Sequence, residues 1–139
     1  MSHSARRRAR IAACQTLYSR VFVEINPIGE DLIVKNLKLS EKGTEFYNQL
    51  LNATLDNLYR VDQTIQKHLL KWKQSRISDS LNAILRIGCC ELLYFKETDA
   101  KVVFNESIEI CREFAGEDAV KILNGVLHAV WKTISVKDS

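Results

Sequence analysis

The residues best suited to chemistry are four arginines near the start of the chain: Arg6, Arg7, Arg8 and Arg10. An arginine guanidinium presents a fork of N–H donors that matches a phosphate group, and its flat face stacks on exposed nucleobases. With Arg20 they give the first 23 residues a charge of +5, whereas the rest of the chain carries 15 basic and 17 acidic side chains. A basic end on a slightly acidic body predicts a binding site for a polyanion.

These arginines fall where a helix covering about residues 4–22 should begin. At about 100° per residue, Arg6, Arg7 and Arg10 share the sector that apolar residues occupy farther along the helix. They therefore continue the core-facing stripe, and they avoid burial only if the helix start projects from the bundle or faces something anionic. Cations at a helix N-terminus also oppose the helix dipole. RNA binding explains both features, and a merely solubilising basic end is the alternative.

The rest of the sequence predicts the elements that must hold this helix. Helical periodicity recurs along the chain, convincing strand alternation is absent, and there is only one proline. We therefore expect an all-α fold, a compact helical bundle forming a single domain over residues 1–139. Residues 24–39 predict a turn at Asn26-Pro27 and Gly29-Glu30 with at most one short helix. The other expected helices cover residues 40 or 44–71, 78 or 79–96, 101–114, and 117 or 118–136.

Three glycines interrupt the helical patterns. Gly88 lies on a buried stripe, where a glycine costs about 1 kcal/mol relative to alanine, so we expect another helix to approach closely there. Gly116 should end a helix in the left-handed conformation. Gly125, inside the last helix, predicts tight packing or a hydrogen bond between helices.

Neither catalysis nor metal binding is indicated. His3, His68 and His128 are isolated and show no metal-ligand spacing, and no glycine-rich phosphate loop is present. No stretch approaches the roughly 18 apolar residues that span a membrane. We therefore expect a cytoplasmic, non-enzymatic protein without metal or cofactor. The four cysteines form no Cys-x-x-Cys pair, and we expect reduced thiols in or near the core: Cys14, Cys89, Cys90 and Cys111.

Two segments resemble the NusB family. The first is Ala5-Arg6-Arg7-Arg8-Ala9-Arg10, continuing through Ala13, Gln15, Leu17 and Tyr18. The second runs through Leu85-Arg86-Ile87, Glu91-Leu92, Lys101-Val102, Asn105-Glu106, Phe114, Gly116-Glu117-Asp118, Lys121 and Asn124-Gly125-Val126-Leu127. The chain departs from the family pattern where Asp99 replaces a proline, Ile122 a phenylalanine or similar large residue, and His128 an acidic one.

The resemblance implies two packed three-helix bundles and a bacterial transcription antitermination factor. Such proteins bind boxA, a single-stranded RNA element of ribosomal RNA operon leaders, together with NusE, a ribosomal small-subunit protein. The complex joins other Nus factors and RNA polymerase and promotes read-through of terminators. On matching positions, the implied RNA-binding residues are Arg6, Arg7, Arg8, Arg10, Tyr18, Lys101, Asp118 and Ile122. The implied NusE-binding residues are Tyr18 with the exposed side of a helix carrying Asn82, Arg86 and Glu91.

Other interpretations remain open at this point. Tyr18 also fits a core position, and Asp118 also fits a helix cap. The chain could be a stand-alone helical RNA-binding or adaptor module related to the N-terminal domain of ribosomal RNA cytosine methyltransferases. It could be an adaptor that binds only protein, or a homodimer whose RNA surface stays hidden until NusE binds.

Overall fold

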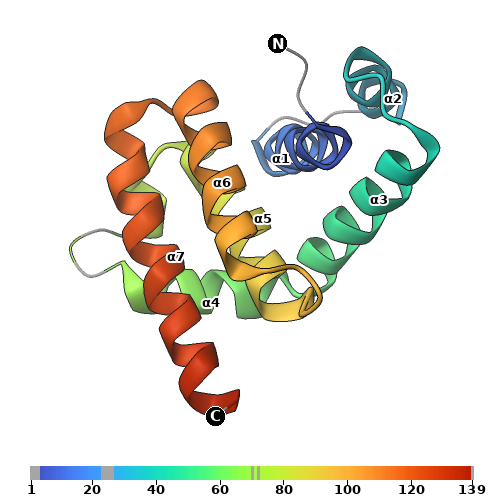
Figure 1. Ribbon diagram of the computed structural model, residues 1–139. Coiled ribbons are helices and arrows are strands. Elements are labelled where there is room, and N and C mark those ends of the chain that lie inside the picture. Colours follow the sequence, from blue (N-terminus) through green and yellow to red (C-terminus); the bar gives the residue numbers. More distant parts are fainter. Residues whose placement is uncertain (1–3, 23–26, 70, 72, 139) are drawn as a thin grey trace.

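The computed structural model describes residues 4–22, 27–69, 71 and 73–138, and within them it contains helices and no strand (Figure 1). The prediction of an all-α fold is therefore confirmed. No helix in this part of the chain is long and apolar enough to cross a membrane. The helices are α1 (Ala5–Phe22), α2 (Pro27–Asn36), α3 (Glu41–Asp56), α4 (Leu58–His68), the 3-10 helix η1 (Gln74–Arg76), α5 (Asp79–Tyr94), α6 (Ala100–Phe114) and α7 (Glu117–Asp138).

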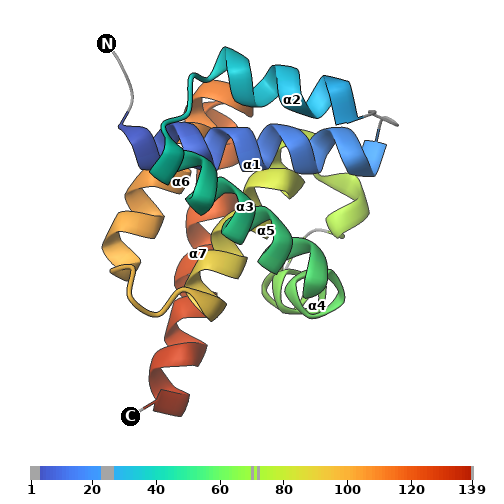
Figure 2. The ribbon, with the colours of Figure 1, turned by 90° about the vertical axis from the view of Figure 1, so that its right-hand side faces the viewer.

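The helices form two bundles that pack together. In the first bundle α1 packs against both α2 and α3, and in the second α5, α6 and α7 pack against one another. The short α4 completes the second bundle through contacts with α5 and α7. Because α1 also packs against α5, it joins the two bundles, and Figure 2 shows it running lengthwise through the upper part of the molecule, below α2. The expected pair of packed bundles is confirmed.

One continuous core runs through both bundles. It includes all four cysteines, which are free and buried, as expected. Burial raises the pKa of both Cys14 and Cys89 to about 12, so these thiols stay protonated at neutral pH. The largest apolar side chains with the least exposure are Ile11, Leu17, Leu50, Val61, Ile65, Leu81, Leu85, Val103, Leu123, Leu127 and Val130.

Short polar side chains start several helices, at Ser4 and Ser78 as the sequence predicts and also at Asp99. The Ser4 hydroxyl accepts a hydrogen bond from the Arg7 backbone N–H at 3.1 Å. Ser78 accepts one from Leu81 in the same way, also at 3.1 Å. Asp99 accepts one from the Lys101 N–H at 2.9 Å. These acceptors satisfy backbone donors that the first turn of a helix leaves unpaired.

The prediction of a single long helix from residue 40 or 44 to residue 71 is wrong, because the chain bends at Asn57, between α3 and α4. The backbone of Asn57 leaves the helical region with φ −117° and ψ 22°. Its side-chain amide donates to the Ala53 carbonyl oxygen at 2.8 Å, a local bond that competes with the helix. Apolar spacing continues through the bend, so periodicity could not reveal it.

The second correction concerns residues 24–39. The expected short helix exists, but α2 begins at Pro27 and includes Gly29 and Glu30, which were expected in a turn. Proline suits a first helical position because its missing N–H would have no helical partner there. Glu30 then binds Arg20 of α1, with 2.6 Å between Arg20 Nε and Glu30 Oε2. Residues 23–26 lie outside the described part of the chain.

The glycines behave in three different ways. Gly116 has φ +98°, so it ends α6 in the left-handed conformation as predicted. A Cβ at Gly88 would lie 3.0 Å from Ser107 Oγ and 3.3 Å from Leu127 Cδ1, which confirms the expected close approach. A Cβ at Gly125 would meet nothing within 4 Å. The expectation of tight packing at Gly125 is therefore wrong.

Changing Gly88 to valine should lower the free energy of unfolding by about 1–3 kcal/mol, because its methyl groups would overpack the contact with α6 and α7. Urea denaturation followed by circular dichroism measures this change. Gly125→Val is the matched control: it places the same side chain in open space on the same type of element and should change stability little. Equal destabilisation by both variants would contradict the packing argument.

Candidate functional site

The best-anchored arginine of the first helix is Arg10, which is buried with an exposed fraction of only 3%. Its Nε and Nη2 donate to the two carboxylate oxygens of Glu91 at 2.8 and 2.6 Å, and Glu91 of α5 is 1% exposed. A buried charge is tolerated only when it is paired in this way. The prediction that Arg10 contacts RNA is therefore corrected: its anionic partner is inside the protein.

Arg7 has an internal partner as well, although it lies nearer the surface. Its side chain is 27% exposed, and its Nε forms an ion pair with Glu106 of α6. The hydrogen bond to Glu106 raises the pKa of Arg7, and Glu109 and Glu113 raise it further. Part of the Arg7 charge is therefore neutralised inside the protein, and only the donors not engaged by Glu106 can face an external anion.

Arg6 is the exposed member of the set. Its guanidinium carbon lies 4.3 Å from the centre of the Phe46 ring, a cation–π contact between α1 and α3. Phe46 itself is 5% exposed and packs edge-on against Phe95, with ring centres 5.9 Å apart. Among the described residues no carboxylate pairs with Arg6, so its charge is available to a ligand. Arg8 is half-buried, and its Nε has no partner among the described residues.

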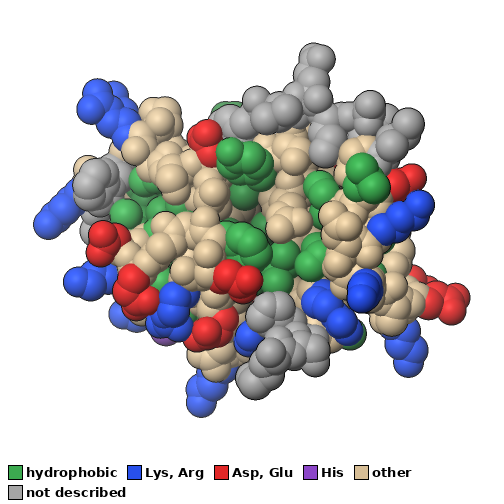
Figure 3. All heavy atoms as spheres, turned by 90° about the horizontal axis from the view of Figure 1, so that it is seen from above, with side chains coloured by type: hydrophobic (Ala, Val, Ile, Leu, Met, Phe, Trp, Pro, Cys, Tyr) green, Lys and Arg blue, Asp and Glu red, His purple; other side chains and the backbone are tan. Residues whose placement is uncertain are grey.

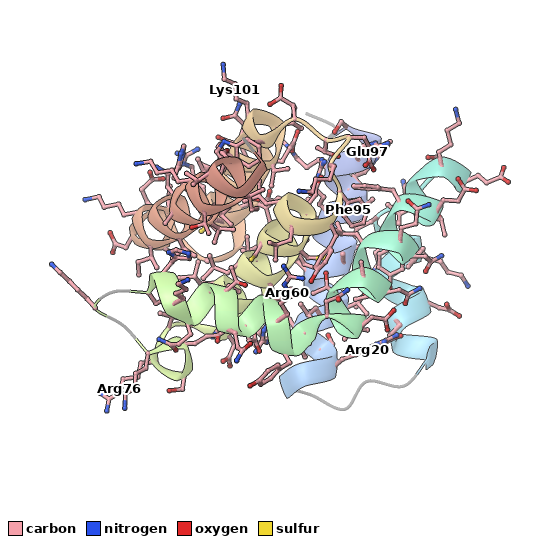
Figure 4. All side chains as sticks on the ribbon, turned by 90° about the horizontal axis from the view of Figure 1, so that it is seen from below. Arg20, Arg60, Arg76, Phe95, Glu97 and Lys101 are labelled. Carbon is pink, nitrogen blue, oxygen red and sulfur yellow. The ribbon has the colours of Figure 1, made fainter. Side chains whose placement is uncertain are left out.

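A groove of about 570 Å³ adjoins this part of α1. We call it the α1 groove; the residues that matter most below are Arg6, Arg10, Glu97, Asp99, Val102 and Glu106. It lies between the start of α1 and the segment that joins α5 to α6. Figure 4 shows Glu97 beside the first turn of α1 and Lys101 pointing outward from the start of α6. The structure thus brings Lys101 to the same end of the molecule as the predicted arginines.

Tyr18 lies at a second, apolar groove farther along α1. This groove has a volume of about 150 Å³ and lies between α1, α5 and α6. Tyr18 is 38% exposed and Phe114 is 41% exposed at its rim. Hydrophobic side chains gather in the middle of the face seen from above, among charged ones (Figure 3). We call the groove at Tyr18, between α1, α5 and α6, the Tyr18 groove. Its apolar lining also includes Ile11, Cys14, Ile84 and Ile110.

The remaining predicted RNA-binding residues lie elsewhere. Asp118 is exposed in the first turn of α7, and Ile122 is half-buried one turn later. Ile122 lines a third groove with His68, Lys71 and Lys121, and this groove shares no lining residue with the α1 groove. The structure therefore does not assemble all the predicted residues into one pocket.

The expectation of an exposed helix side carrying Asn82, Arg86 and Glu91 is wrong. Asn82 is 5% exposed and donates to the Gln74 carbonyl oxygen at 2.8 Å. Arg86 forms a bidentate pair with Asp62 of α4, at 2.8 and 3.1 Å. With Glu91 bound to Arg10, all three side chains make contacts within the protein. Asn82 and Glu91 are buried and so do not form part of the surface that a partner would contact.

Sequence reasoning missed the internal acids and the aromatic support. Glu91 follows Gly88 by three residues and so shares its buried stripe, which was a usable signal for a buried partner of a stripe arginine. Glu106 carried no signal of an internal partner, and Phe46 carried none beyond its apolar character. Among the described residues no group of histidine, cysteine and acidic side chains could hold a metal ion.

Comparison with known proteins places this arrangement in a class. The chain is 36% identical over 122 residues to the transcription antitermination protein NusB of Shouchella clausii, covering 88% of this chain and 90% of that protein. It is 34% identical over 133 residues to NusB of Nitratiruptor sp., covering 94% of each chain. The class is thus that of helical transcription antitermination proteins. A model of the NusB family matches residues 7–132, and the chain belongs to the NusB family.

Solved structures share the fold. A chain in a crystal structure of a plectonemic RNA supercoil superposes with a TM-score of 0.86 at 27% identity, covering 95% of this chain and 97% of that one. A chain in the crystal structure of antitermination factors NusB and NusE in complex with dsRNA gives a TM-score of 0.82 at 25% identity, covering 93% and 97%. NusB of T. maritima gives 0.79 at 28% identity, covering 95% and 93%.

Removing one member of the buried pair should be costly. We expect Glu91→Ala to lower the free energy of unfolding by about 3–5 kcal/mol, because it leaves the Arg10 guanidinium buried without a partner. The double variant Arg10→Met with Glu91→Leu should recover most of the loss, since it removes both charges. Urea denaturation measures each variant, and Glu109→Ala, at an exposed ion pair, serves as the control with little expected change.

Proposed function

We propose that this protein is a cytoplasmic, RNA-binding transcription antitermination factor that binds single-stranded boxA RNA of ribosomal RNA operon leaders together with NusE. In that role it joins other Nus factors and RNA polymerase and promotes read-through of terminators. The observation that carries the proposal is the exposed Arg6 guanidinium, which is held against Phe46 at the edge of a groove in a NusB-family chain.

Several features support RNA as the ligand of this end of the molecule. Arg6 has no internal carboxylate partner among the described residues, whereas Arg7 and Arg10 do. Lys101 adds an exposed cation nearby. Solved neighbours of the fold include one chain in a complex with NusE and dsRNA. Arg8, Asp118 and Ile122 stay predictions as RNA contacts, with Asp118 and Ile122 outside the α1 groove.

The RNA test must leave the buried pair intact. We expect Arg6→Ala with Arg7→Ala to weaken boxA binding at least about tenfold and to lower the salt slope of log K by about 0.7 for each lost phosphate contact. Fluorescent boxA-type RNA and a scrambled control are titrated at fixed salt, with and without NusE. Arg76→Ala removes an exposed arginine on η1, away from α1, and should bind like the parent (Figure 4). Unchanged binding by the double variant would contradict the proposal.

The Tyr18 groove suits a protein partner better than RNA, because its lining is largely apolar and its rim carries two partly exposed aromatic rings. We assign NusE to this groove as part of the proposal.

Tyr18→Ser should weaken NusE binding about tenfold, because a rim aromatic contributes strongly when a partner covers it. Calorimetric titration with NusE in the absence of RNA measures the change. Tyr59→Ser is the matched control, since Tyr59 is 77% exposed on α4 and lines neither groove. Equal effects of the two serine variants on NusE binding would contradict the assignment of NusE to the Tyr18 groove.

A further inference from the structure

The charges of the α1 groove do not suit a phosphate group. Two arginines and three carboxylates line it, but two of these are neutralised internally: Arg10 by Glu91 and Glu106 by Arg7. The charges left to face a ligand are those of Arg6, Glu97 and Asp99. Their sum is negative, so a phosphate placed inside the groove would meet net repulsion.

The same groove contains a surface for stacking. Phe46 supports one side of the Arg6 guanidinium at 4.3 Å, and Arg6 remains exposed. A guanidinium that contacts a ring on one side leaves its other side for a planar group, and arginine planes are a common platform for unpaired bases. Val102, which is 43% exposed, adds an apolar contact at the groove edge.

The carboxylates supply hydrogen-bond acceptors beside that platform. Glu97 is exposed and, within the described part of the chain, forms no ion pair or hydrogen bond with another side chain. Asp99 uses Oδ1 to cap α6 through the Lys101 N–H, which leaves Oδ2 available. An ionised carboxylate only accepts hydrogen bonds, so it favours a base edge that donates. The exocyclic amino group of cytosine is such a donor, and uracil has a carbonyl oxygen at the same position.

We propose that the α1 groove is a base-reading subsite, in which an unpaired base with an exocyclic amino group stacks on Arg6 and donates to Glu97 or Asp99. This inference rests on the RNA binding proposed above and adds a source of sequence preference to it. The phosphates of the bound strand run outside the groove, where Lys101 is exposed. Cytosine therefore binds in preference to uracil, which has the same ring size.

The test compares oligo(C) and oligo(U) of equal length, titrated as fluorescent strands in the same salt. The parent protein should bind oligo(C) at least about fivefold more tightly, as expected for a specific hydrogen bond to a base edge. The variant Glu97→Gln with Asp99→Asn removes both charges and keeps a helix-capping side chain at residue 99. For this variant the ratio of oligo(C) affinity to oligo(U) affinity should fall to about one. Both affinities should rise, because two negative charges are lost.

A matched control separates base reading from charge. Glu45→Gln with Asp56→Asn makes the same two chemical changes at exposed positions of α3 that do not line the groove. It should leave the ratio unchanged. The single variant Glu97→Gln leaves the Asp99 cap of α6 unchanged, so any effect it has cannot come from loss of that cap. It should also lower the ratio of oligo(C) to oligo(U) affinity.

The outcomes distinguish the two proposals. BoxA-type RNA is titrated alongside as the reference: if it does not bind, with or without NusE, the proposed RNA-binding function fails, and if it binds while neither oligomer does, that function stands and the base-reading subsite is refuted. If both oligomers bind equally well, or if the preference for oligo(C) survives the groove variants, RNA binding stands and the base-reading subsite is refuted.

Discussion

The position of α1 depends on one interaction, the buried pair between Arg10 and Glu91. Two ionised groups with almost no access to water are stable only with both carboxylate oxygens and the guanidinium fork engaged, and this geometry allows little sliding or rotation. The pair therefore fixes the register of α1 on α5. Because α1 also packs against α3, fixing it sets how the first bundle lies on the second.

The first turns of α1 show how one helix stripe passes from core to surface. Arg10 is deep and paired, Arg7 is partly exposed and paired with Glu106, and Arg6 is exposed and supported by Phe46. These three residues have the same chemistry and share one sector of the helix, so their roles differ mainly with their distance from the edge of the bundle. The result is a site of mixed charge, in which cations and carboxylates alternate around a hollow. Such a surface can discriminate among ligands better than a uniformly basic one.

Much of the fold follows from local sequence, and much of the site does not. Helix starts at Ser78 and the stop at Gly116 were predictable because capping and left-handed backbone are local properties. The bend at Asn57 was not, since the apolar spacing continues across it. Arg10 could not be separated from Arg6 by sequence, because burial depends on how far α5 and α6 extend beside α1. Nor could sequence show that Ile122 lies in a different groove from Arg6.

The order of the helices along the chain has a consequence for synthesis. The first bundle is complete once Asp56 has been made, and the chain enters the second bundle only once, at Asn57. Glu91 lies 81 residues after Arg10, so the pair cannot form until most of α5 has been made, long after the first bundle is complete. Until then the first bundle has an unpaired guanidinium on the face that will become internal, and its docking on α5 must wait. Because Arg7 and Arg10 pair with Glu106 of α6 and Glu91 of α5, the arginine end of α1 reaches its final geometry only after α5 and α6 have left the ribosome.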